Sequence, residues 1–191
     1  NAFLEIFKDD VCLEIIRMIF PQLKNLDNLK KLNSHAHDNL SKVDFIFLLS
    51  LLIIDGTDNT DYFIYKFNLS KKDQKRLRSI DLFYKENVNL KNFTEKNLNK
   101  IFYYKGKQTV LDIINFKLLT SIKVEKKLLK LIEIYTNKTL PAFPIGAKMI
   151  MSKYSIPEGK TLGNKLKQIE ETWVQNNFQI SEKQILKVIK G

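Results

Sequence analysis

Helix-breaking residues are concentrated in one stretch of this sequence, and this distribution constrains the fold more than any other feature. Three of the four prolines and three of the six glycines lie between residues 141 and 163. Elsewhere apolar residues recur at helical spacing, as in the stripe formed by Phe3, Phe7, Val11 and Ile15. No segment alternates apolar and polar residues as a strand does, and no Asn-Gly hairpin turn occurs. The sequence therefore predicts an all-α protein of about ten helices.

Polar residues stand where helix N-termini are expected, because their side chains can accept hydrogen bonds from unpaired backbone N–H groups. Ser41 precedes a helical segment over residues 42–54, and Ser70 with Asp73 approaches the spacing of a capping box. The charge-free apolar run over residues 45–54 predicts a fully buried helix. This run is too short to span a bilayer, which needs about 20 residues, so no membrane partner is expected. Other helix starts are indicated near Thr94, Gln108 and Ser181.

The stretch rich in glycine and proline divides the chain into a helical body, residues 1–137, and a shorter helical tail, residues 138–191. Each proline of "PAFPIG" lacks a backbone donor and disfavours helix in the residue before it. Beyond this boundary, Gly159 and Gly163 flank the start of a longer helix. The buried stripe of that helix is expected to consist of Leu162, Leu166, Ile169 and Trp173.

The charge is distributed unevenly along the chain. The formal net charge is +11, yet residues 1–55 carry six Lys and Arg against eight Asp and Glu. Residues 56–191 carry 26 basic and 13 acidic side chains, a balance of +13. A basic bias of this size favours a polyanion as partner, because lysine and arginine neutralise phosphates. The alternative is a Lys- and Asn-rich composition with no functional meaning.

One helical segment, residues 70–84, concentrates the positive charge on a single face. Lys71, Lys75 and Arg78 are spaced by four and three residues, whereas Leu77 and Ile80 lie nearly opposite. Cations spaced by helical turns of about 5–6 Å can follow neighbouring phosphates. The alternative is a solvated helix face, which is the usual role of such a run of charges.

The turn around residue 160 has the composition of a phosphate-binding helix start. A helix that begins there exposes unpaired N–H groups, and Gly159 and Gly163 would let a phosphate approach the backbone closely. Lys160 adds a point charge beside them. The alternative is a tight turn that needs glycine only for its backbone angles.

No complete catalytic or metal-binding arrangement is found in the sequence. A His-Asp phosphohydrolase site needs a further distant histidine, and this chain has only His35 and His37, which we interpret as part of a polar loop. The segment "DGTDNTD", residues 55–61, has Lys66 where a calcium loop needs glutamate, so a helix connection is expected. Cys12 is most simply a core residue, and a single cysteine fits a reducing, cytoplasmic setting. We therefore expect neither catalytic nor metal-binding residues.

The segment over residues 140–178, "LPAFPIGAKMIMSKYSIPEGKTLGNKLKQIEETWVQNNF", resembles the C-terminal region of the bacterial class II tRNA nucleotidyltransferase and poly(A) polymerase family. Lys148 stands where the family has aspartate, and a family glycine near Tyr154 is replaced. Looser similarity covers earlier segments, including residues 67–80. The matching positions of the tail are Pro141, Phe143, Pro144, Ile145, Gly159, Leu162, Gly163, Leu166, Ile169, Glu170 and Trp173.

The resemblance implies that body and tail hold the acceptor stem and T arm of tRNA while an N-terminal head adds nucleotides. The head's Asp-x-Asp pair and Glu-Asp-x-x-Arg template do not occur in these residues. The resemblance thus implies a chain that is inactive alone, with no cofactor of its own. Magnesium and ATP or CTP are expected only for the head.

The sequence therefore predicts a part of a tRNA nucleotidyltransferase or poly(A) polymerase that binds tRNA or another structured RNA, with no DNA partner expected. Recognition would rest on duplex shape and phosphates rather than base edges. The alternatives are a helical scaffold or protein-interaction module with incidental charge, and a metal-dependent phosphohydrolase. From charge and position, the proposed RNA contacts are Lys71, Lys75, Arg76, Arg78, Lys153, Gly159, Lys160, Gly163, Lys165 and Lys167.

Overall fold

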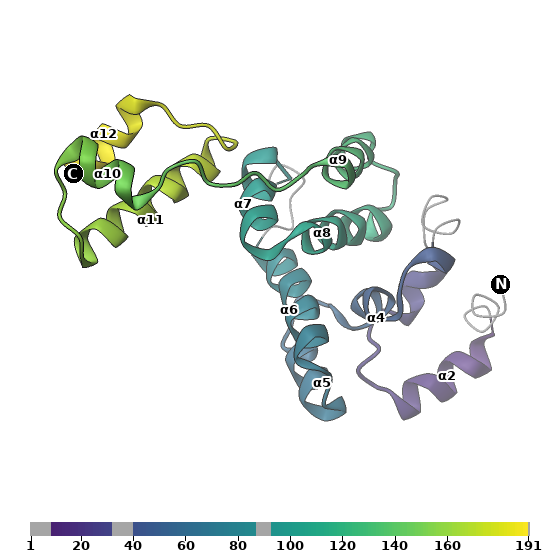
Figure 1. Ribbon diagram of the computed structural model, residues 1–191. Coiled ribbons are helices and arrows are strands. Elements are labelled where there is room, and N and C mark those ends of the chain that lie inside the picture. The colour runs from purple at the N-terminus through teal and green to yellow at the C-terminus, as the bar shows by residue number, and fades with distance from the viewer. Residues whose placement is uncertain (1–8, 32–39, 87–92, 191) are drawn as a thin grey trace. The chain divides into compact units, whose positions relative to one another are not determined.

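The computed structural model describes residues 9–31, 40–86 and 93–190 (Figure 1). These residues form ten α-helices and two short 3-10 helices, and they contain no strand. The all-α prediction is therefore confirmed. The elements are α2 (Asp10–Ile19), η1 (Leu26–Lys31), η2 (Leu40–Lys42), α4 (Phe45–Ile53), α5 (Asn59–Phe67), α6 (Lys71–Glu86), α7 (Glu95–Lys105), α8 (Lys107–Thr120), α9 (Lys126–Asn137), α10 (Ala147–Tyr154), α11 (Lys160–Gln175) and α12 (Glu182–Lys190).

The chain divides into two compact units. Unit 1 comprises Asn1–Phe93 and Gln108–Thr136, and unit 2 comprises Thr94–Lys107 and Asn137–Gly191. The boundary expected from the sequence assigned residues 94–107 to the body. In the structure these residues, which include α7, pack with the tail instead.

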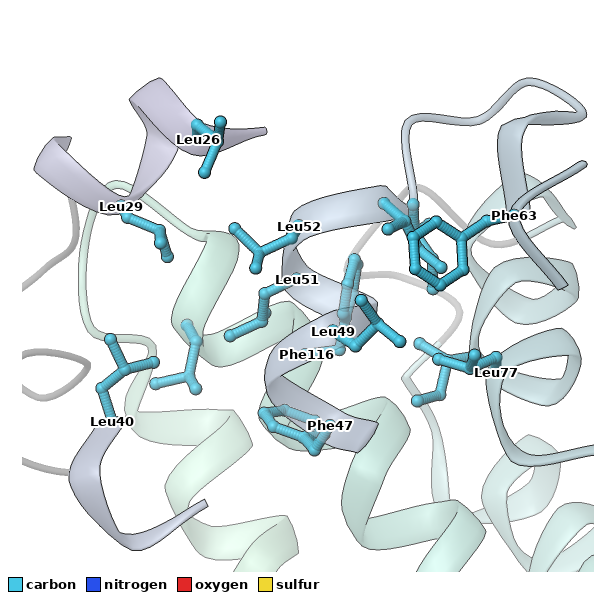
Figure 2. Packing of buried hydrophobic residues seen from close by; sticks show 14 of the residues in the cluster. Leu26, Leu29, Leu40, Phe47, Leu49, Leu51, Leu52, Phe63, Leu77 and Phe116 are labelled. Carbon is cyan, nitrogen blue, oxygen red and sulfur yellow. The ribbon is translucent and has the colours of Figure 1, made fainter. Parts of the chain in front are cut away.

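Helix α4 supplies the centre of the core of unit 1. Its buried side chains include Leu51 and Leu52, which Figure 2 shows among apolar residues from η1, α5, α6 and α8. Ile53 is fully buried, whereas Phe45 at the start of the helix remains 69% exposed. The expected buried helix is thus confirmed from Leu49 onward, and in the first turn Phe47 is buried as well.

The start of α4 differs from the sequence prediction. Ser41, the expected N-cap, lies in η2, and α4 begins only at Phe45. Asp44 caps the helix, because its Oδ1 accepts a hydrogen bond of 3.1 Å from the backbone N–H of Phe47. The short 3-10 helix uses residues 40–42 and so delays the α-helix by one turn.

The two predicted side-chain caps are confirmed, and the one at Ser181 is a full capping box. At the start of α6, the N–H of Asp73 donates to Ser70 Oγ over 3.2 Å, and Ser70 Oγ donates to Asp73 Oδ2 over 2.6 Å. Before α12, the N–H of Ser181 donates to Gln184 Oε1 over 2.8 Å. The N–H of Gln184 returns a bond of 3.4 Å to Ser181 Oγ. Both helices therefore begin where local side-chain chemistry dictates.

Helix α2 turns most of its apolar residues outward. Leu13 is buried, but Val11, Ile15 and Met18 are 66%, 52% and 83% exposed. Of the expected stripe, Phe3 and Phe7 lie outside the described residues. The helix therefore packs against the core through Leu13, and the predicted stripe residues Val11 and Ile15 remain exposed.

An arginine on α6 joins two carboxylates of unit 1. Arg76 donates to Asp112 of α8 over 2.6 and 2.8 Å, and it donates to both oxygens of Asp44 over 2.7 Å each. The Asp112 side chain is only 3% exposed, and Gln108 donates a further bond of 2.9 Å to it. The hydrogen bonds to Asp112 and Asp44 raise the pKa of Arg76. The bonds from Arg76 in turn lower the pKa of the Asp44 carboxyl.

Replacing Arg76 by alanine should lower the free energy of unfolding by about 3–5 kcal/mol, because it leaves the Asp112 carboxylate buried without its cation. Urea denaturation followed by circular dichroism measures this change. Arg78→Ala is the matched control on the same helix, since its pair with Asp61 is about half exposed on both sides. The control should cost about 0–1 kcal/mol, and equal losses for the two variants would contradict a structural role of Arg76.

Candidate nucleic-acid interface

The division of α6 into a basic and an apolar face is confirmed. Leu77 and Ile80 are buried in the core, whereas Lys71, Lys75 and Arg78 are exposed. Within the parts of the chain that the structure describes, neither lysine forms an ion pair. We call Lys71, Lys75 and Arg78 the α6 basic face. It is a row of cations on a helix that is fixed from behind by its apolar side.

The guanidinium of Arg78 is already partly neutralised. Its Nε donates to Asp61 of α5 over 2.8 Å, and its terminal nitrogen donates to Gln74 over 3.2 Å. The pair lies at the surface, so it is weak and can exchange with another anion. The two lysines are therefore the stronger members of the face.

Arg76, a predicted RNA contact, has a structural position instead. Its side chain is 18% exposed, and its guanidinium is occupied by Asp44 and Asp112. At about 100° per residue, position 76 lies about 140° around the helix from Lys71. It therefore lies beside the core and not on the α6 basic face.

Two predicted contacts of the tail also make bonds within unit 2. Lys153 of α10 pairs with Glu182 of α12 over 2.6 Å, and this hydrogen bond raises the pKa of Lys153. Lys165 of α11 donates over 2.7 Å to the backbone carbonyl of Val188, near the C-terminus of α12. A cation is favourable at the C-terminal end of a helix. Lys153 and Lys165 therefore attach α12 to α10 and α11 at its two ends.

The turn before α11 is exposed, and so are the remaining predicted residues. Lys160, Gly163 and Lys167 follow one another at steps of three and four along an exposed side of α11. We call them the α11 basic face. Gly159, at the N-cap, has φ of 144°, a value that L-residues rarely adopt. The backbone of this turn therefore requires glycine at position 159.

Gly163 has no such backbone requirement. A Cβ placed on it would meet nothing within 4 Å, so neither packing nor φ explains the glycine. Its position leaves open space beside the first turn of α11. The N-terminus of that helix carries partial positive charge, which favours an approaching anion.

Glu170 and Trp173, two positions of the tail motif, hold α7 in unit 2. Tyr103 of α7 donates a hydrogen bond of 2.5 Å to Glu170 Oε1, and its ring meets Trp173 edge-on at 5.5 Å. Phe143 and Phe178 lie 5.3 and 5.0 Å from the same indole. This aromatic cluster explains why residues 94–107 pack with the tail. The expected buried stripe of α11 is confirmed, since Leu162, Ile169 and Trp173 are buried and Leu166 is partly buried.

The other candidate sites add little. His35 and His37 lie outside the described residues. Among the residues that are described, no cluster of three or more His, Cys, Asp or Glu could hold a metal ion. Residues 54–58 connect α4 to α5, so the connection expected over residues 55–61 is confirmed only in its first part, and residues 59–61 form the first turn of α5. Asp55 accepts two hydrogen bonds from Thr57. Cys12 is only partly buried and is not the core residue that its apolar neighbours suggested.

A hollow of about 340 Å³ lies beside η1, α4 and α8 in unit 1. Two of its polar side chains, Asn25 and Ser121, bond within the protein. Asn25 donates over 2.5 Å to the carbonyl of Ile54, and Ser121 donates over 2.6 Å to that of Lys117. Because these groups are used internally, the hollow offers little to orient a ligand.

Comparison with protein families finds no family model that matches the chain, and no curated protein matches it either. Across the described helices, none combines the length and the apolar character needed to cross a membrane.

The bond to Glu170 raises the pKa of Tyr103 to about 12, from an ordinary value of about 10. A raised pKa means that this bond stabilises the fold below pH of about 10 and is lost as pH rises toward 12. Absorption of tyrosinate against pH should therefore show a late titration step. Burial also raises the pKa of Tyr104, so the late step should lose amplitude in Tyr103→Phe and move to lower pH in Glu170→Ala. A late step of unchanged amplitude in Tyr103→Phe would contradict the assignment.

Proposed function

We propose that this chain is the RNA-binding part of a tRNA nucleotidyltransferase or poly(A) polymerase. In this proposal it holds the acceptor and T-arm half of tRNA while a head outside these residues adds nucleotides to the 3′ end. The observation that carries the proposal is the α6 basic face, where Lys71 and Lys75 project from a helix whose other side is fixed in the core. The resemblance of the tail to that family supplies the identity of the RNA.

The α6 basic face suits the backbone of a duplex. Lys71 and Lys75 are one helical turn apart, so their charges are separated by about 5–6 Å along a rigid element. Side chains cannot reach base edges in the deep groove of A-form RNA, and recognition there uses phosphates and 2′-hydroxyls. Contacts of this kind fix position and orientation without reading sequence.

The α11 basic face is the second proposed contact. Lys160 and Lys167 present cations on the same side of the helix as Gly163, where the backbone is open to approach. A phosphate at this helix start would meet both the helix dipole and a lysine. Lys153 and Lys165 lie outside this face, because their ammonium groups attach α12.

Transfer chemistry would belong to the head. The family needs paired carboxylates to hold Mg²⁺ for phosphoryl transfer, and the sequence has no Asp-x-Asp pair. We therefore expect the chain alone to add no nucleotide when ATP, CTP and Mg²⁺ are supplied.

A protein-interaction module remains the second candidate, and the exposed apolar side of α2 favours it. Val11, Ile15 and Met18 form an exposed hydrophobic strip on one helix, and exposed apolar patches commonly mark protein contacts. This alternative does not require any polyanion.

Labelled tRNA should bind the chain saturably, with a Kd of about 10⁻⁴ to 10⁻⁶ M near physiological salt and much tighter at low salt. Lys71→Ala combined with Lys75→Ala should weaken binding and reduce the slope of log affinity against log salt by about 2. Fluorescence anisotropy at several salt concentrations measures both quantities.

The matched control is Lys24→Ala combined with Lys130→Ala, which removes two exposed lysines of unit 1 outside α6. This variant has the same net charge as the first and should retain most of the affinity. Equal losses in the two double variants would mean that bulk charge alone attracts the RNA. Absence of saturable binding at low salt would favour the protein-interaction module.

A further inference from the structure

An exposed tyrosine stands beside the α6 basic face. Tyr65 of α5 is 86% exposed, the most exposed aromatic ring among the described residues. It lines an open groove of about 690 Å³ between α5 and α6. The groove is lined by Ile64, Tyr65, Lys66, Asn68, Gln74 and Arg78.

The groove combines an apolar floor, an aromatic wall and a cationic rim. Ile64 is 3% exposed and forms part of the core beneath. Tyr65 lies on α5 one turn after Asp61, the residue that pairs with Arg78 across the two helices. The ring therefore lies on the side of α5 that adjoins the α6 basic face.

The exposure of Tyr65 is not explained by the fold. Its helix packs through Phe63 and Ile64, which are 6% and 3% exposed, so Tyr65 contributes little to the core. An exposed aromatic ring offers a flat apolar surface on which a partner can stack. The neighbouring cations indicate that this partner carries negative charge.

We propose that the α5–α6 groove binds an unpaired nucleotide of RNA, with its base stacked on Tyr65 and its phosphates near Arg78 and Lys66. A paired base cannot offer its flat face to a protein, whereas an unpaired base can stack on an aromatic side chain. The inference rests on the proposed RNA-binding function and extends it from duplex backbone to a single-stranded segment. An acidic peptide would satisfy the cations but would leave the ring without a flat partner.

The test uses the full chain and two labelled probes, a short oligouridine and an RNA duplex. Tyr65→Ala should weaken oligouridine binding about fivefold or more, the loss expected for one base stacked on an aromatic ring. It should leave duplex binding unchanged. Tyr65→Phe should retain affinity for oligouridine, because the ring and not the hydroxyl makes the contact.

Tyr62→Ala is the matched control. Tyr62 is also an exposed tyrosine of α5, at 53%, but it does not line the groove. Its replacement should leave oligouridine binding unchanged. The proposal is overturned if Tyr65→Ala has no effect, if Tyr62→Ala weakens oligouridine equally, or if polyglutamate displaces oligouridine as well as unlabelled RNA does.

The outcome separates this inference from the proposed function. If Lys71→Ala with Lys75→Ala weakens the duplex while Tyr65→Ala leaves oligouridine unaffected, the groove assignment fails and the proposed function stands. If neither probe binds at low salt, both fail. Circular dichroism of Tyr65→Ala should match that of the parent chain, since the side chain is almost fully exposed.

Discussion

The ion pair between Arg76 and Asp112 is the interaction on which unit 1 most depends. Burying the Asp112 carboxylate is unfavourable unless a cation and further donors surround it, and Arg76 with Gln108 supplies both. Because the guanidinium also bonds to Asp44 at the start of α4, the pair fixes the rotation of α6. That rotation decides which residues of α6 face outward.

The functional surface of unit 1 follows from this constraint. With Arg76 held inward, Lys71, Lys75 and Arg78 point away from the core, and the same orientation forms the groove beside Tyr65. Unit 2 is held together by different contacts. There Trp173 and Glu170 of α11 hold α7 through Tyr103, which leaves the Lys160 side of α11 exposed.

Much of the fold could be predicted because its signals are local. Periodicity identified the helices, and the Ser70 and Ser181 caps depend only on residues three positions away. The prediction of Ser41 as the N-cap of α4 was wrong because Ser41 lies in a 3-10 helix. Both Ser and Asp are favourable N-cap residues, so local sequence could not distinguish Ser41 from Asp44. The place of α7 could not be predicted, since the Tyr103–Glu170 bond joins residues 67 positions apart.

The candidate site was harder to predict for the same reason. Composition identifies lysines and arginines as possible phosphate contacts, but it does not reveal which of them have acidic partners. Arg76, Lys153 and Lys165 are occupied by residues distant in sequence, whereas Lys71 and Lys160 are exposed. The exposure of Tyr65 could have been predicted from the helical spacing of α5. Tyr65 lies opposite the apolar stripe of Phe63 and Phe67, and this indicates a solvent-facing position.

The most direct test of the account is a map of backbone amide shifts in the isotope-labelled chain as a tRNA acceptor-arm hairpin is added. The account predicts that the shifts concentrate on residues 71–78 of α6 and 159–167 at the start of α11, and that α9 is unaffected. Shifts that avoid α6, or that spread evenly over exposed lysines throughout the chain, would contradict it.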